Sequence, residues 1–223
     1  MITMFDYRDT ELLKEHNTML LIIGRTASGK DTFANRYCKA TGTTKVVSYT
    51  TRPRRLGETD THIFLDKKTA LDMFKPEEKA AFTQINGHEY FSTIPQIMHN
   101  QVYIIDPNGL SQVLHRCPQI RFYVLYLMAR ECDRCWHFID RNGEDPTLGQ
   151  ILFQEREHSE KIMFDAFEHQ VLDGDERRLR FINSYPNLKD ILVWRNHYID
   201  DDYGLLTARI AGQIMMDIWS EMG

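Results

Sequence analysis

An apolar run at residues 19–23 leads directly into Gly24-Arg25-Thr26-Ala27-Ser28-Gly29-Lys30. A continuous apolar run of this kind is typical of a parallel strand that is buried on both faces. Residues 31–41 then have a helical pattern that ends at Gly42. Glycines let the backbone turn its N–H groups inward, the lysine reaches the outer phosphates, and the helix N-terminus adds positive potential. This strand, loop and helix together predict a phosphate-binding P-loop over residues 24–30, and we expect ATP as its ligand.

The residue after the loop lysine departs from the usual motif. Ser or Thr usually stands there and ligates Mg²⁺ through its hydroxyl, whereas this chain has Asp31 followed by Thr32. A carboxylate is a suitable hard ligand for Mg²⁺, but it also places negative charge beside the phosphates. We therefore expect Mg²⁺ at this position, ligated by either Asp31 or Thr32.

Strand-like and helix-like segments alternate along the rest of the chain. The predicted strands are 45–48, 102–106, 121–127 and 178–183, and the predicted helices are 67–82, 148–171 and 205–222. Residues 83–91 predict a hairpin around Asn86-Gly87. Such alternation predicts a parallel sheet with helices on both faces. The expected fold is an α/β, three-layer P-loop NTPase fold: a single domain over 1–223 with an N-terminal extension at 1–18 and a small inserted lobe.

The composition limits the classes of partner. A net charge of −5 and a pI near 6.0 disfavour broad binding to nucleic acid polymers, which requires a basic surface. No apolar stretch is long enough to span a membrane, and the acidic residues Asp6, Asp9 and Glu11 do not fit a signal peptide. We therefore expect a cytoplasmic protein, a monomer or homodimer, whose partners are small-molecule nucleotides.

A basic turn follows the second predicted strand, with the sequence Ser48-Tyr49-Thr50-Thr51-Arg52-Pro53-Arg54-Arg55-Leu56-Gly57-Glu58. This run resembles the guanylate kinase family, whose members have Ser-x-Thr-Thr-Arg-x-x-Arg-x-Gly-Glu at the same distance beyond the P-loop. The resemblance implies an ATP-dependent nucleoside monophosphate kinase in which Arg52 and Arg55 bind the acceptor phosphate. Guanidinium groups bind phosphate oxygens in a bidentate way, so the residue types fit this role. A solvated basic turn is the alternative interpretation.

The resemblance continues through the predicted acceptor lobe at 50–98. Gly87-His88-Glu89-Tyr90-Phe91-Ser92 stands where the family has its substrate hairpin, which implies that Tyr90 binds the acceptor phosphate and that Ser92 is a weaker candidate for the base. Ile105-Asp106-Pro107-Asn108-Gly109 matches a family strand end, which implies that Asp106 accepts hydrogen bonds from the base. Ser48 is a further expected substrate contact, and a helix cap is the alternative role for Asp106.

Two departures concern the acceptor. The family places a glutamate before the hairpin to pair with guanine, whereas this chain has Ala81 at the aligned position. Loss of such a hydrogen bond reduces discrimination by orders of magnitude, and Glu77, Glu78 and Glu89 are possible substitutes. A family tyrosine that binds phosphate aligns near His62. The expected acceptor is GMP, dGMP or a related nucleotide, and the alternative is another deoxynucleoside monophosphate.

The predicted lid covers 137–160. Arg141-Asn142-Gly143-Glu144 resembles the start of the family lid, and Arg156 stands as a second lid arginine. The resemblance implies that Lys30, Arg141 and Arg156 act in phosphoryl transfer, since transfer needs positioning and charge neutralisation. A solvated helix face explains Arg156 equally well. Asn183 resembles a residue near the donor adenine. A non-catalytic interaction module is the alternative from another functional class, which the intact Lys30 argues against.

Overall fold

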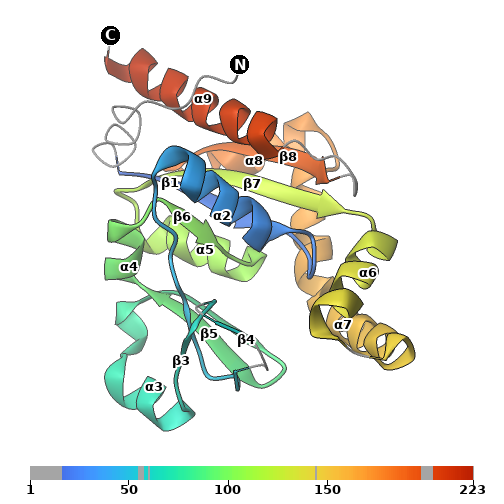
Figure 1. Ribbon diagram of the computed structural model, residues 1–223. Helices are drawn as coiled ribbons and strands as arrows, with labels where there is room; N and C mark the ends of the chain where they lie inside the picture. The colour runs from blue at the N-terminus through green and yellow to red at the C-terminus, as the bar shows by residue number, and fades with distance from the viewer. Residues whose placement is uncertain (1–16, 55–57, 60, 144, 197–202, 223) are drawn as a thin grey trace.

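The computed structural model describes residues 17–54, 58–59, 61–143, 145–196 and 203–222. Its central sheet is parallel, with the strand order β6-β1-β7-β8. The strands are β1 (Thr18–Ile23), β6 (Val102–Ile104), β7 (Arg121–Ala129) and β8 (Leu188–Asn196). Helices cover both faces of this sheet (Figure 1). The α/β fold class and the parallel central sheet predicted from the sequence are therefore confirmed.

The residues of β1 alternate between two hydrophobic clusters, one on each face of the sheet. Leu20 and Ile22 pack with α2 (Lys30–Thr41) and α9 (Tyr203–Met222). Met19, Leu21 and Ile23 pack on the other face, which is covered by α5 (Pro107–Arg116), α7 (Pro146–Val171) and α8 (Asp175–Asn183). Full burial of each such side chain contributes about 1.5–3 kcal/mol. This two-sided burial explains why the strand is a continuous apolar run.

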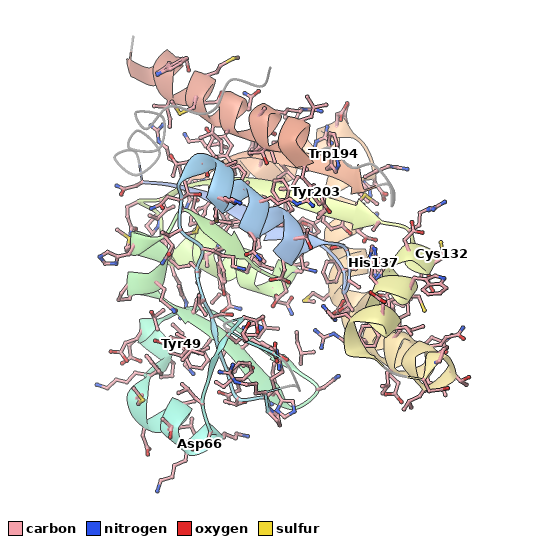
Figure 2. All side chains as sticks on the ribbon, in the orientation of Figure 1. Tyr49, Asp66, Cys132, His137, Trp194 and Tyr203 are labelled. Carbon is pink, nitrogen blue, oxygen red and sulfur yellow. The ribbon has the colours of Figure 1, made fainter. Side chains whose placement is uncertain are left out.

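A second, smaller sheet forms a lobe beside the central sheet, with the strand order β3-β2-β5-β4. Its strands are β2 (Tyr49–Thr50), β3 (Ile63–Phe64), β4 (Lys79–Ile85) and β5 (His88–Thr93), and its helices are α3 (Lys67–Met73) and α4 (Ile94–His99). Asn86 and Gly87 connect β4 to β5 with φ values of 49° and 76°, as a tight hairpin turn requires. Figure 2 labels Tyr49 in this lobe, where its ring stacks on Phe91 with centroids 5.1 Å apart. The predicted hairpin is confirmed.

The predicted strand at 178–183 is wrong, because these residues belong to α8. Asp175 and Glu176 lie in the first turn of α8, where negative charge favours a helix. The last strand is β8 instead, which pairs with β7 from Phe122 to Ala129.

Two other predicted segments are shorter or displaced. The helix predicted at 67–82 ends at Met73, and Pro76 begins a short 3₁₀ turn before β4. Proline cannot continue a helix because it lacks the N–H and its ring clashes with the preceding turn. Residues 45–48 form a single parallel bridge, from Lys45 to Val102, and the strand that follows is β2.

Helices α6 (Glu131–Asn142) and α7 form a pair at the carboxyl end of β7 (Figure 1). Phe138 and Phe153 meet edge to face, with centroids 5.8 Å apart. A Cβ at Gly149 would lie 2.8 Å from Cγ1 of Ile139, so glycine permits the close approach of the two helices. Within the described part of the chain, no helix is long and apolar enough to cross a membrane.

Candidate functional site

The loop after β1 is shaped by residues that are small or have a positive φ. A Cβ at Gly24 would lie 2.5 Å from the carbonyl oxygen of Leu127 and from Oγ of Ser28, so a side chain has no room there. Ala27 and Gly29 have φ values of 59° and 91°, a region that is costly for residues other than glycine. The loop is thus wound closely around the end of the sheet.

Lys30 begins α2 and turns back over the loop. Its Nζ donates a hydrogen bond of 2.8 Å to the carbonyl oxygen of Arg25. Burial lowers the pKa of the Lys30 ammonium to about 8, although the Glu160 carboxylate favours the charged form. A ligand with negative charge would restore the ordinary preference for the protonated form.

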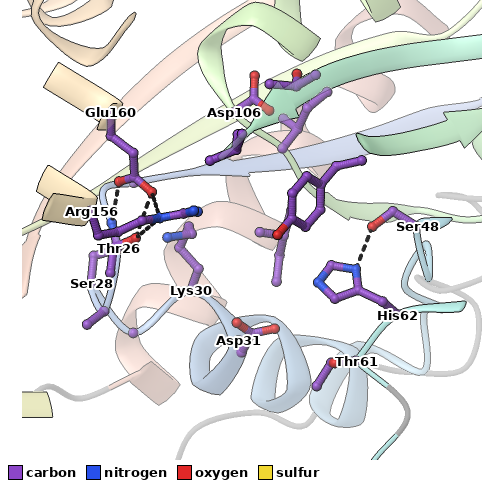
Figure 3. A pocket seen from close by; sticks show the side chains of 18 of the residues that line it. Thr26, Ser28, Lys30, Asp31, Ser48, Thr61, His62, Asp106, Arg156 and Glu160 are labelled. Carbon is purple, nitrogen blue, oxygen red and sulfur yellow. Dashed lines mark hydrogen bonds and ion pairs between the residues drawn. The ribbon is translucent and has the colours of Figure 1, made fainter. Parts of the chain in front are cut away.

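A cavity of ≈ 1670 Å³ lies between the loop, the small lobe and the helix pair α6–α7 (Figure 3). Most of the predicted site residues line it. They are Gly24, Thr26, Ala27, Ser28, Gly29, Lys30, Asp31, Thr32, Ser48, Arg52, His62, Tyr90, Asp106, Arg141 and Arg156. The fold therefore brings the loop, Arg52 of the basic turn, and Arg141 and Arg156 of the helix pair to one cavity.

The other predicted site residues lie elsewhere. Arg25 does not line the cavity, because its guanidinium binds Glu168 and Asp165 of α7. Ser92 is fully buried in β5 and Asn183 is exposed at the end of α8, and neither lines the cavity. Asn183 was predicted to follow a strand of the central sheet, and the helix found there places it away from the site. Arg55 lies outside the described residues.

On the lobe side of the cavity, Arg52 makes a bidentate ion pair with Glu58, in which Nη1 lies 2.7 Å from Oε2. This pairing raises the pKa of Arg52. The Arg52 guanidinium also lies over the ring of Phe64, 5.0 Å from its centroid. The Arg52 side chain is thus partly buried and held in place by specific contacts, rather than being fully solvated.

Two further polar side chains lie beside this arginine. Oγ of Ser48 and Nδ1 of His62 are 3.0 Å apart (Figure 3). Burial and the neighbouring charge of Arg52 lower the pKa of His62. The imidazole is therefore neutral at pH 7 and offers hydrogen bonds without adding charge.

Asp106 lies beyond the carboxyl end of β6 and caps α5. Its Oδ1 accepts a hydrogen bond of 2.8 Å from the N–H of Gly109. Burial raises the pKa of the Asp106 carboxyl, and the Gly109 hydrogen bond opposes this shift. Asp106 thus both caps a helix and faces the cavity, so the two interpretations from the sequence are compatible.

Ala81 lies on β4 and lines the cavity, with 3% of its surface exposed. The glutamates considered as substitutes, Glu77, Glu78 and Glu89, do not line it.

The residues that would hold Mg²⁺ lie in the first turn of α2. Asp31 and Thr32 both line the cavity, and the Asp31 carboxylate lies 3.7 Å from Nζ of Lys45. Among the described residues, no three His, Cys, Asp or Glu side chains gather as a metal cluster. Mg²⁺ commonly binds through one or two protein oxygens together with substrate phosphates. The oxygens of Asp31 and Thr32 fit that pattern.

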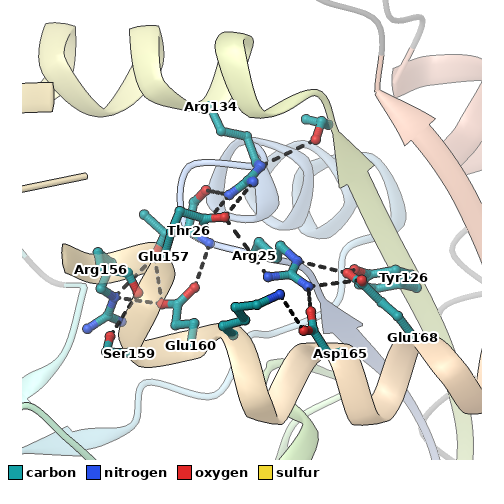
Figure 4. Close-up of polar contacts among 12 residues, drawn as sticks. Arg25, Thr26, Tyr126, Arg134, Arg156, Glu157, Ser159, Glu160, Asp165 and Glu168 are labelled. Atoms are coloured by element: carbon teal, nitrogen blue, oxygen red, sulfur yellow. Dashed lines mark hydrogen bonds and ion pairs between the residues drawn. The ribbon is translucent and has the colours of Figure 1, made fainter. Parts of the chain in front are cut away.

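Helix α7 contributes acidic residues that the sequence analysis missed (Figure 4). Glu160 accepts hydrogen bonds from the N–H and the hydroxyl of Thr26, at 3.0 and 2.7 Å. Nε of Arg156 donates to Glu160 at 2.6 Å and to the Thr26 hydroxyl at 3.2 Å. Burial disfavours the Glu160 carboxylate, but Arg156 and the Thr26 hydrogen bonds lower its pKa overall. Glu160 is thus an ionised, buried ligand of the loop.

No family model and no curated protein matches this sequence. Among solved structures, the fold is similar to a guanylate kinase from Anaplasma phagocytophilum, with 15% sequence identity and a TM-score of 0.52, over 90% of this chain and 86% of that one. An uncharacterized protein from Eubacterium ventriosum has a TM-score of 0.43 and 11% identity, over 88% of this chain and 98% of that one. At 15% identity, the first similarity bears on the fold alone.

Proposed function

We propose that this chain is a P-loop nucleoside monophosphate kinase that transfers the γ-phosphoryl group of ATP to GMP, dGMP or a related nucleotide. The observation that carries the proposal is the shared cavity, which is lined by Lys30, by Arg52 and by the lid arginines Arg141 and Arg156. Direct transfer requires donor and acceptor phosphates to meet in one site with the reacting atoms aligned. The similarity to a guanylate kinase fold supports a nucleotide kinase of this kind.

The donor side consists of the loop and the N-terminus of α2. The loop N–H groups and the Lys30 ammonium bind the β- and γ-phosphates of ATP. Asp31 or Thr32 would hold Mg²⁺, which would neutralise phosphate charge when bound. The low pKa of Lys30 rises as these phosphates enter, because negative charge favours the ammonium.

The acceptor side consists of the small lobe. Arg52 exchanges its contact with Glu58 for the acceptor phosphate, two of whose oxygens can accept the same pair of parallel guanidinium hydrogen bonds. The hydroxyl of Tyr90 and the His62–Ser48 pair complete this end of the site. Asp106 accepts hydrogen bonds from the base.

The transfer step depends on the helix pair α6–α7. Arg141 and Arg156 neutralise the charge that spreads over the moving phosphoryl group in the transition state. Because both arginines belong to one packed helix pair, closure of that pair brings them to the phosphates together and excludes water. Hydrolysis of ATP without an acceptor is expected to be slow for the same reason.

Ala81 bears on which base the acceptor nucleotide carries. Ala81 offers no hydrogen bond to the N1–H and amino group of guanine, and this favours a second candidate, a kinase for another deoxynucleoside monophosphate. The interaction-module alternative is disfavoured, because Lys30 and both loop glycines are retained.

The test is ADP release from ATP and Mg²⁺, measured with each common ribo- and deoxynucleoside monophosphate in turn. We expect one acceptor or a small group of acceptors to stimulate turnover strongly. Arg52→Ala should weaken the acceptor far more than ATP, since this side chain lies on the lobe side of the cavity. If no monophosphate stimulates turnover while Lys30→Ala leaves nucleotide binding intact, the kinase proposal fails.

A further inference from the structure

The carboxylate of Glu160 binds the same kinds of donor that bind a phosphoryl group. It accepts from the main-chain N–H of Thr26 at 3.0 Å and from Nε of Arg156 at 2.6 Å (Figures 3 and 4). Only 5% of its side chain is exposed. Loop N–H groups and arginines are the usual ligands of phosphoryl oxygens. A carboxylate at this place is therefore chemically similar to a phosphate oxygen pair.

The position of Thr26 along the loop indicates which phosphate of a nucleotide the Glu160 carboxylate resembles. Thr26 lies near the start of the loop, at the side facing α7, whereas Lys30 and the N-terminus of α2 lie at its end. Arg156, which the proposed function assigns to the transferred group, binds both Thr26 and Glu160. Under that assignment, the terminal phosphoryl of a triphosphate meets the donors that Glu160 uses. Two anions cannot share these donors without strong repulsion.

We infer that Glu160 acts as a substitute for the γ-phosphoryl group: it holds the Thr26 amide and Arg156 until a bound triphosphate displaces it. This inference rests on the proposed function. A nucleoside diphosphate lacks the terminal group and leaves the Glu160 contacts in place. The exchange therefore makes the release of Arg156 depend on a triphosphate.

The rest of α7 provides an anchor for this exchange. After Glu160 the helix is fixed to the core by Phe164, Phe167 and Val171, all at most 5% exposed. Its earlier half packs on α6 instead, through Phe153 and Phe138. The exchange that we infer therefore moves the part of α7 that packs on α6 and leaves the anchored half on the sheet.

The test compares ATP with ADP by calorimetric titration of the full chain, in the wild type and in Glu160→Gln. Glutamine has the same shape but lacks the negative charge, so it competes less with a phosphoryl group. We expect the ratio of ATP affinity to ADP affinity to rise about tenfold. The substitution removes one charged hydrogen bond from the state in which residue 160 competes with the phosphoryl group. Asp165→Asn is the matched control: it removes one charge from the same helix and also contacts a loop residue, Arg25. Its affinity ratio should not change.

Other outcomes overturn the inference. If Glu160→Gln weakens ATP, or changes ATP and ADP equally, Glu160 only braces the loop. An equal rise of the ratio in Asp165→Asn would show a general charge effect instead. Glu160→Asp keeps the charge but withdraws it from Thr26, so it should raise the ratio of ATP affinity to ADP affinity to a smaller extent. This variant replaces Glu160→Gln in the test if Glu160→Gln does not fold. If neither nucleotide binds the wild type, the proposed function itself fails, which differs from binding with an unchanged ratio.

Discussion

The guanidinium of Arg25 makes two hydrogen bonds to the carboxylate of Glu168, with Nε and Nη2 at 2.8 and 2.9 Å from its oxygens. The first residue lies in the loop after β1 and the second near the end of α7. The hydroxyl of Tyr126 donates to the same carboxylate. Arg25 was predicted to bind the donor nucleotide, yet its contacts show that it fixes the loop to α7.

This pairing predicts a stability effect for Arg25→Met. The substitution leaves Glu168, whose side chain is 23% exposed, without its charged partner. We expect the free energy of unfolding to fall by about 2 kcal/mol, measured by urea denaturation. Asp165→Asn should cost clearly less, because this carboxylate is 45% exposed and solvent screens its ion pair. Equal losses from the two variants would contradict a specific role for the Glu168 pair.

The pKa of Lys30 predicts a pH dependence of ATP binding. Because its pKa is lowered to about 8 in the free protein and rises beside phosphates, the free protein must take up a proton to bind ATP above that pH. Between about pH 8 and 10 the affinity should therefore fall, by up to about tenfold per pH unit. Titration calorimetry in buffers of different ionisation enthalpy measures the uptake directly. Lys30→Met should show no such uptake, and a wild-type affinity that stays constant over this range would refute the assignment.

Ala81→Glu should change the acceptor preference. The new carboxylate enters the cavity near Asp106 and can accept from N1–H and the amino group of guanine. We expect kcat/KM for GMP, relative to the other monophosphates, to rise at least about tenfold. Gln84→Glu is the control, because it adds the same charge to an exposed position of β4 outside the cavity. An identical response of the two variants would mean that Ala81 does not face the base.

The different surroundings of two helical glycines predict opposite effects of their substitution by alanine. Gly212→Ala, on α9, meets no atom within 4 Å and should stabilise the protein by about 0.5–1 kcal/mol through helix propensity. Gly149→Ala places its Cβ 2.8 Å from Ile139 and should lower stability by about 1 kcal/mol. Thermal denaturation distinguishes the two. Stabilisation by both would show that the helices are not packed this closely.

Local patterns predicted the elements that local chemistry determines. The strand, loop and helix around Gly24 and Lys30 were predicted correctly, because apolar continuity and the glycines act within a few residues. The hairpin at Asn86-Gly87 followed from the positive φ values that its turn demands. In each case the signal and the structure lie in the same short segment.

Elements that depend on distant partners were not predictable in this way. Residues 178–183 contain mixed apolar and polar positions that fit either a strand or a helix, and β8 is distinguished only by its pairing with β7. A solvated helix face was the alternative to a role for Arg156, and Glu160 was not singled out from the sequence. Glu160 in fact binds Thr26, 134 positions earlier in the chain. The hydrophobic periodicity of the sequence does not indicate such a long-range contact.

The strand order also has a consequence for how this chain folds. Within the described ranges, the strands that pair with β1 are β6 and β7, which begin at Val102 and Arg121. Its neighbours are therefore made long after it during synthesis, and contacts of such large sequence separation form slowly. Leu127, whose main-chain oxygen leaves no room for a side chain at Gly24, is synthesised equally late. On the ribosome, we expect the P-loop to gain its shape and its affinity for nucleotide only after β7 has emerged.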